Sequence, residues 1–477
     1  SEKWNGNLFM ALSGLTFTRL IVVRVKTAAG QVQFRRLASM TATKRGPHNL
    51  EPGDTADFEV DGAPVTATIV AEAGTIQAVG GTYPTNFGVP QGGNGTYLNM
   101  TGEDLDYAVK TEQSKQIRYD RQVLDVVQVG ASSQGGFNFE QQFKEYDPMI
   151  EGVMQSTFTE YGVNGLGAAI ADVTLASLSI TAGAATSGPS IFTSLEKGQW
   201  FSVKPPGGAS TTVKNYFKGR AFRLSTVTAP TTTVLTLDPA TPINTSIAGT
   251  DLDGASIYSA RMTNASVMKS YTLEAGHLDV TQFRQYTGMI PSKMDLKLAV
   301  GSIVTGRFEF MGKSMNLLQA SSMGTPVASM LFTPANATRG VFDVFEGGAA
   351  LSATTYVKSA DLMLDNSLRI QDAVGVFGAA GIAAGQIKFT GKLEVYFADE
   401  VMYNKLLSGA ESSFSLPIMD VDGNGYVFYI PRLKYTSAKM GTQGLDQDNM
   451  LSMEFSAIMD NTPTSSTYQK TAAIYRV

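Results

Sequence analysis

The sequence predicts an all-β protein: a β-sandwich or barrel with long amphipathic strands and one or two short helices. We expect an inserted small β domain and a small N-terminal β-rich domain beside it. Three observations support this fold class. Charged residues make up only 17% of the chain, against about 25% in an average protein. The chain contains 48 Gly, and several segments alternate apolar and polar residues with the period of two that strands require.

The first 90 residues have the composition of strands joined by turns. Residues 20–25 form an apolar run rich in β-branched residues, and residues 57–61 and 65–70 form two further strand-like runs separated by a turn at Gly62. A loose stretch over residues 78–95, rich in Gly, Pro and Asn, has the composition of a linker. The sequence therefore predicts an N-terminal β-rich domain over residues 1–90.

A second change in composition covers residues 168–265, where Thr, Ser, Ala and Gly dominate and charges are few. The run Thr232–Leu237 is strand-like and ends at the turn Asp238–Ala240. These features predict a small β module inserted into a larger domain. Residues 95–167 and 266–477 would then form one discontinuous domain.

The strongest periodicity lies in these flanking segments. Apolar residues or Gly occupy nearly every second position, and polar or small residues stand between them, in the runs 296–310, 386–397 and 451–459. Two of these runs are longer than the usual strand of about 5–6 residues. Such strands bury one face and expose the other, so we expect Phe308 and Phe310 in the core.

Helices are predicted at two places. Asp147-Pro148 precedes the apolar residues of a helix ending near Met154, with an N-cap residue and an early Pro. Asp399 precedes a second helix over residues 400–407, which Gly409 ends. We expect the apolar stripes of both helices to pack in the core.

The sequence predicts no catalytic, cofactor-binding or metal-binding residue, and hence no enzyme. The chain has no Cys and two His, so thiolate nucleophiles and thiolate metal sites are excluded. Motifs of hydrolases, P-loops, zinc proteases and dinucleotide-binding proteins are absent from the sequence. We interpret His277 as a loop or strand-end residue, and the pairs Glu103/Asp104 and Asp446/Asp448 as turn acids.

One short motif has two interpretations. Asp420–Gly425 matches the first half of an EF-hand calcium loop, but position 12 is Pro431 instead of the bidentate Glu. The segment also lies between two strand-like runs, which favours a hairpin turn. Whether it binds an ion is left open.

The chain contains no apolar run of about 20 residues, so no membrane span is expected, and Ser1–Trp4 does not open a signal peptide. The net charge is −5. The chain as a whole is therefore not a polycation that holds nucleic acid by neutralising phosphates.

Three sets of segments on either side of the insert resemble the tail tube (major tail) proteins of tailed bacteriophages. Their order and spacing match over nearly all of residues 95–167 and 266–477. The segments are 98–105 with 117–122 and 130–140; 271–274 with 283, 288–289 and 302–313; and 446–455.

This resemblance implies a structural virion protein whose subunits form hexameric rings that stack into a tube around the DNA channel. It implies a β-sandwich tube domain, an exterior position for the 168–265 module, and assembly in the host cytoplasm. It also implies contact with tape measure, terminator and distal tail proteins, and DNA passage without sequence-specific binding. The segments 17–25 and 46–55 resemble part of a contractile-tail sheath protein instead.

The alternative function is a surface or secreted β-module adhesin or carbohydrate-binding protein, and a β-sheet hydrolase is a more distant third. For a DNA channel we expect a weakly repulsive lumen with more Asp and Glu than Lys and Arg. Basic residues on the lining strands should then be paired with acids or directed towards contacts between rings. The polar set of the alternating runs is mixed in sign: Lys297, Arg307, Glu309, Lys388, Lys392 and Glu394.

Overall fold

The protein is described from a computed structural model. The described residues are 21–26, 32–37, 55–60, 63–68, 81–82, 87–88, 97–117, 119–120, 122–161, 170–183, 191–243, 246–277, 282–324, 329, 332–338, 340–341, 343–353, 355–398, 400–441, 448–461 and 470–477.

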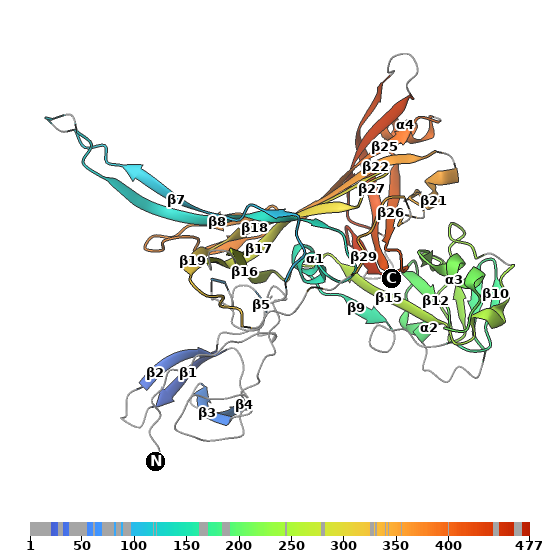
Figure 1. The fold of residues 1–477 in the computed structure, drawn as a ribbon, viewed down its shortest axis with the longest axis horizontal. Helices are drawn as coiled ribbons and strands as arrows, with labels where there is room; N and C mark the ends of the chain where they lie inside the picture. Colours follow the sequence, from blue (N-terminus) through green and yellow to red (C-terminus); the bar gives the residue numbers. More distant parts are fainter. Residues whose placement is uncertain are drawn as a thin grey trace.

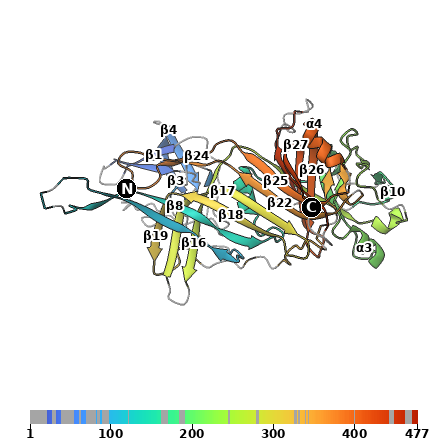
Figure 2. The same ribbon diagram turned by 90° about the horizontal axis from the view of Figure 1, so that it is seen from above.

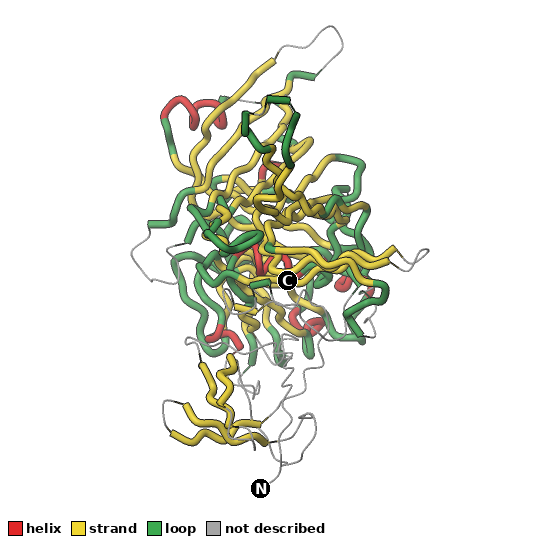
Figure 3. The backbone as a smooth tube through the Cα atoms, turned by 90° about the vertical axis from the view of Figure 1, so that its left-hand side faces the viewer, coloured by secondary structure: helices red, strands yellow, loops and turns green. Residues whose placement is uncertain are grey.

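Eight antiparallel strands, part of a larger sheet of 20 strands, form the centre of the molecule, and this confirms the predicted all-β class. We call these eight strands the central sheet. Figure 2 shows β17 and β18 between β8 on one side and β22 and β25 on the other. Strands dominate the backbone and helices are few and short (Figure 3). The strands, in their order across the sheet, are β7 (Asp106–Gln113), β8 (Val126–Glu140), β18 (Thr305–Gly312), β17 (Gln282–Ala299), β22 (Val357–Asp365), β25 (Lys388–Tyr396), β28 (Met450–Ala457) and β27 (Gly425–Gly441).

The predicted alternation sets which face of this sheet is buried. Leu296 and Leu298 of β17 and Phe308 and Phe310 of β18 are all buried, as expected. One detail of the prediction is wrong: residues 296–310 form two strands of a hairpin, not one long strand. The two strands are joined by a turn at Val300, which is 68% exposed. Apolar and polar positions keep the same alternation on both sides of this turn, so the sequence pattern does not reveal it.

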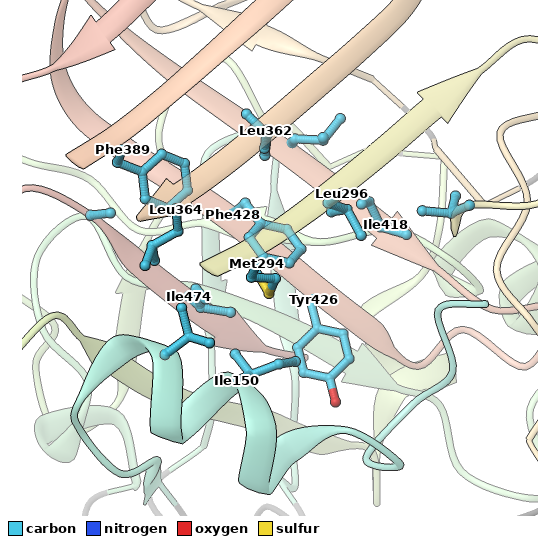
Figure 4. Close-up of a cluster of buried hydrophobic side chains, with 14 of the residues drawn as sticks. Ile150, Met294, Leu296, Leu362, Leu364, Phe389, Ile418, Tyr426, Phe428 and Ile474 are labelled. Carbon is cyan, nitrogen blue, oxygen red and sulfur yellow. The ribbon is translucent and has the colours of Figure 1, made fainter. Parts of the chain in front are cut away.

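Further strands cover the buried face of this sheet. Four of them pair with the first half of β17 or of β27. The other two extend the sheet from one of these four, β29 (Ala473–Arg476). Helix α1 (Asp147–Met154) packs against β17, and Ile150 meets Met294 and Tyr426 in the core (Figure 4). These further strands are β16 (Lys269–His277), β19 (Ser314–Leu318), β26 (Glu411–Met419), β29 (Ala473–Arg476), β15 (Ser256–Thr263) and β9 (Thr159–Tyr161).

Both predicted helices are present. The apolar residues of α1 are fully buried, but Asp147 is its first residue and Tyr146 takes the N-cap position. Helix α4 (Val401–Ser408) ends at Gly409 in the left-handed conformation, as expected; Asp399 lies outside the described residues. The core prediction for α4 is only partly right, because Met402 is buried while Leu407 is 69% exposed.

Residues 170–257 contribute to a second hydrophobic cluster, apart from the main one. A three-stranded sheet lies here, formed by β10 (Thr174–Ala176), β11 (Ser179–Thr181) and β14 (Val234–Thr236). The segment also contains helices α2 (Ile191–Ser194) and α3 (Thr211–Phe217), which the sequence interpretation as purely β missed. Strand β12 (Trp200–Lys204) pairs with β15, which connects through β29 to β27 of the central sheet.

The N-terminal segment contains a four-stranded antiparallel sheet, which agrees with the strand-like runs in the sequence. Its strands are β1 (Ile21–Lys26), β2 (Val32–Leu37), β3 (Thr55–Val60) and β4 (Ala63–Thr68), in the order β2-β1-β3-β4.

Candidate assembly surface

The face of the central sheet that points away from the core carries charges of both signs in regular rows. One row crosses four strands in the order Lys297, Asp361, Lys392 and Glu454. Each residue in this row lies directly opposite the next one on the neighbouring strand. Side chains directly opposite each other on antiparallel strands lie about 4.5–5.5 Å apart at Cβ, so opposite charges attract. Each lysine in this row therefore has a carboxylate as its neighbour.

A second row follows the same rule. Lys293 lies opposite Glu309 on one side and Asp365 on the other, and Asp365 lies opposite Lys388. The Lys293 Nζ–Glu309 Oε2 distance is 3.8 Å. These four charges alternate in sign across four strands.

Arg307 connects the sheet to the segment before β7. Its guanidinium donates to both carboxylate oxygens of Asp104, each at 2.7 Å, and its Nε lies 3.5 Å from Glu309 Oε1. The hydrogen bond from Arg307 holds the pKa of Asp104 below its usual value. We call the charged face with these rows the polar face of the sheet.

The polar face is suited to contact a highly charged polymer without holding it. Binding to a nucleic acid strengthens with each phosphate that an unpaired Lys or Arg neutralises. A lysine flanked by carboxylates presents little net positive charge to a phosphate. The polar face of the single chain is therefore close to electrically balanced.

The hairpin of β7 and β8 extends away from the rest of the molecule (Figure 1). Before Ser133, over residues 126–132, β8 pairs only with β7 among the described residues. A two-stranded hairpin has no core of its own and is marginal in water, and exposed apolar clusters mark contact sites. Its exposed apolar residues are Val109, Ile117, Tyr119, Val123, Leu124, Val126, Val127 and Val129.

Two of the acids considered in the sequence, Glu103 and Asp104, have structural partners. Glu103 receives a hydrogen bond from Arg284 Nη2 at 2.5 Å, and Asp104 pairs with Arg307. His277 is exposed at the end of β16, and Asp446 lies outside the described residues. Within the part of the chain that the structure describes, no group of three or more His, Cys, Asp or Glu could hold a metal ion.

The segment Asp420–Gly425 is the turn between β26 and β27, in agreement with the hairpin interpretation. Asp420 is buried, and its Oδ1 accepts the backbone N–H groups of Asp422 and Asn424 at 2.8 and 2.9 Å. Gly423 has a φ of +83°, which favours glycine. The carboxylate therefore stabilises the turn through backbone amides.

The sequence analysis did not identify the exposed apolar residues of this hairpin. The signal was present, because Val123, Leu124, Val126, Val127 and Val129 stand close together in a segment with charged neighbours. An apolar run of that kind has the same composition in a core strand, and only the tertiary structure shows that nothing described in the chain covers it. None of the described helices is long and apolar enough to span a membrane.

The family model of phage tail tube proteins matches residues 67–457. The match spans most of the chain and includes the central sheet, helices α1 and α4 and the residues between them. It does not reach the segments 17–25 and 46–55, so it gives no support to their likeness to a sheath protein. No curated protein matches the chain significantly.

Proposed function

The chain belongs to the phage tail tube protein family, and from this membership we propose that its copies form rings that stack into a tube through which phage DNA passes. The family is one of structural virion proteins of the phage tail, not of enzymes. Ring formation, stacking and DNA passage are the proposed part.

The observation that carries the proposal is the central sheet with its two unlike faces. One face is buried under α1 and the second layer of strands, and the other presents the balanced rows of charge described above. We propose that the polar face lines the channel. Duplex DNA can then slide along it, because the paired lysines offer few free cations to phosphate.

The partners implied by the family resemblance fit the same arrangement. We propose that the ends of the tube meet the terminator and distal tail proteins and that the tape measure protein occupies the lumen before DNA does. Assembly would take place in the host cytoplasm, and the segment around residues 170–254 would lie on the outside of the tube. The residues before 90 would form a separate N-terminal unit.

Negative-stain electron microscopy of the purified chain tests the proposal. We expect rings or tubes with a central channel. An adhesin or carbohydrate-binding protein would instead remain as single particles, and that result, under conditions where the chain is folded, would contradict the tube function.

The outer segment should be dispensable for assembly. Ile170 and the Gly254–Ala255 pair exchange backbone hydrogen bonds at 2.8 and 2.6 Å, so the ends left by removing residues 171–253 are close enough to be joined by Gly-Ser-Gly. β15 loses its pairing with β12 in this variant but keeps its pairing with β29 and β9. We expect this variant to form tubes with a smaller outer diameter in electron micrographs. A folded variant that stays monomeric would show that the segment is an assembly interface.

Replacing the two acidic residues of one row with lysine should make the channel retain DNA. In the variant Asp361→Lys/Glu454→Lys, the row with Lys297 and Lys392 becomes wholly basic, and each added phosphate contact strengthens binding. We expect assembled variant tubes to bind short duplex DNA at about 0.05 M salt, with an affinity that falls steeply as salt rises. Fluorescence anisotropy measures this binding, and Asp251→Lys, an exposed position in the outer segment, is the control. Equal DNA binding by the variant, the control and the unmodified chain would exclude the polar face from the lumen.

A further inference from the structure

The eight-stranded sheet consists of two four-stranded units with the same pairing order. Unit 1 runs β7-β8-β18-β17 and unit 2 runs β22-β25-β28-β27. In the chain, a short helix follows the second strand of each unit, α1 in unit 1 and α4 in unit 2. A further strand joins each unit at its fourth position: β16 pairs with the first half of β17 in unit 1, and β26 pairs with the first half of β27 in unit 2.

The units also share their irregularities. The pairing of β17 with β18 shifts between Pro291 and Lys293, and that of β27 with β28 shifts between Tyr435 and Ser437. A second shift in pairing register occurs between β16 and β17 in unit 1 and between β26 and β27 in unit 2. These two shifts lie at matching positions of the units. Bulges are specific features of a strand. Two of them in the same positions show that the units are copies of one structure.

The strand-pairing registers of the two units show which residue of unit 1 corresponds to which residue of unit 2. Phe308-Glu309-Phe310 matches Met453-Glu454-Phe455, because Gly135 pairs with Phe310 and Gly391 pairs with Phe455. Through β8 and β25, Asp106, Tyr107 and Ala108 of unit 1 correspond to Met363, Leu364 and Asp365 of unit 2. Through the bulges, Lys293, Met294 and Asp295 of unit 1 correspond to Ser437, Ala438 and Lys439 of unit 2.

The two units join edge to edge within the chain. β17 of unit 1 pairs with β22 of unit 2, and Met294 lies opposite Leu364 there. Both side chains are buried, with 2% and 0% exposed. The opposite edge of β7, and the edge of β27 beyond Lys434, have no partner among the described residues. Free edges of this kind are templates for pairing with another chain.

The two free edges are complementary when they are placed in the register of the internal junction. Ala438 then lies opposite Tyr107 on the core side, and both are only half-buried in the single chain, in contrast to Met294 and Leu364. On the polar face Lys439 lies opposite Asp106, and both are exposed. Opposite charges placed across two strands stabilise their pairing.

We propose that β27 of one chain pairs antiparallel with β7 of a second copy, Lys439 opposite Asp106, in a repetition of the internal junction. This proposal rests on the ring assembly proposed above. The contact joins two different edges, so it propagates head to tail, and in the ring assembly proposed above the last copy pairs with the first. Each chain supplies two units. The ring of six expected from the family resemblance is then made of three chains, not six.

The contact begins at Asp106 because unit 1 departs from unit 2 just before it. The carbonyl oxygen of Leu105 accepts hydrogen bonds from Tyr286 Oη at 2.8 Å and from Arg284 Nη1 at 3.3 Å. In unit 2 the strand continues through the matching residue, Leu362. The carbonyl of Leu105 is thus occupied within its own chain.

Disulfide cross-linking tests the register and the number of chains together. The chain contains no cysteine, so the variant Lys439→Cys/Asp106→Cys has only the two introduced thiols. After assembly and mild oxidation, we expect denaturing, non-reducing electrophoresis to show species of one, two and three chains and none larger. The matched control is Asp295→Cys/Met363→Cys, the same pair at the internal junction, which should give only an intramolecular bond.

The possible failures are distinguishable. Rings or tubes that form without any cross-link, while the control pair oxidises, would overturn the edge contact. A ladder that reaches six chains would confirm the contact and overturn the count of three. If the double variant does not assemble, native mass spectrometry of unmodified rings decides the count, since three chains are expected. Absence of rings and tubes from the unmodified chain would contradict the tube function itself.

Discussion

Replacing Phe308 with Ala is expected to lower the free energy of unfolding of the unassembled chain by about 3–5 kcal/mol. The ring is fully buried. Its centroid lies 4.6 Å from that of Phe139 in a stacked arrangement and 5.6 Å from that of Phe137. The variant loses buried apolar area and these ring contacts, and leaves a cavity between β18 and β8. Denaturant unfolding followed by circular dichroism measures the loss.

Two further variants make this result specific. Thr305→Ala, at an exposed position of the same strand, should change stability by less than about 0.5 kcal/mol. Met453→Ala, at the matching position of unit 2 and also fully buried, should cost about 2–5 kcal/mol. A near-neutral Phe308→Ala would mean that β18 turns its other face to the core.

The fold class was predictable because alternation is a local property of the sequence. A strand with one buried face shows it regardless of its partners, and so Leu296, Phe308, Leu393 and Met453 were correctly placed inside. A turn that preserves the alternation of apolar and polar residues cannot be detected from that alternation. For this reason the sequence predicted one continuous strand where the hairpin at Val300 lies.

The helix α3 was missed for a different reason. Its residues Thr211, Thr212 and Val213 favour strands by intrinsic propensity. Burial of Val213 and Phe217, and the N-cap hydrogen bond that the Val213 N–H donates to Ser210 Oγ at 3.3 Å, outweigh that preference. Tertiary contacts of this kind cannot be read from composition.

The duplication could not be found in the linear sequence. Few residues coincide between the units, as in Glu309 with Glu454 and Gly135 with Gly391, and the long outer segment separates α1 from β16 but has no counterpart after α4. What the two units share is hydrogen-bond register, which a single sequence does not contain.

The same holds for the charges of the polar face. Lys297 and Lys392 could be assigned to the polar face from their positions in the alternation. Their carboxylate neighbours, Asp361 and Glu454, come from other strands, and only the strand order brings them together. The expectation that basic residues on these strands pair with acids fits this geometry, whereas the acid excess of the lumen stays a prediction for the assembled tube.

The second large effect is expected at a buried ion pair that fixes helix α1. The Arg476 guanidinium contacts the carboxylates of Asp147 and Glu160, and its Nε lies 3.2 Å from Tyr258 Oη. Burial raises the pKa of Asp147, and the guanidinium opposes that rise. In Arg476→Met the Asp147 carboxylate stays buried without its cation, which should cost about 3–5 kcal/mol. Denaturant unfolding at pH 8 measures this cost.

The pH dependence and a double variant separate the buried charge from lost packing. Without Arg476, the folded-state pKa of Asp147 rises further above its unfolded value. The variant is therefore least stable above the folded pKa and regains stability as the pH falls through it, because the folded state then takes up a proton. Arg476→Met/Asp147→Asn should recover most of the loss at pH 8, since the amide carries no charge and its oxygen can still accept the hydrogen bond that Tyr426 Oη donates to Asp147. A loss in Arg476→Met that is the same at pH 5 and pH 8, and is not relieved in the double variant, would mean that the Arg476 side chain acts by packing alone.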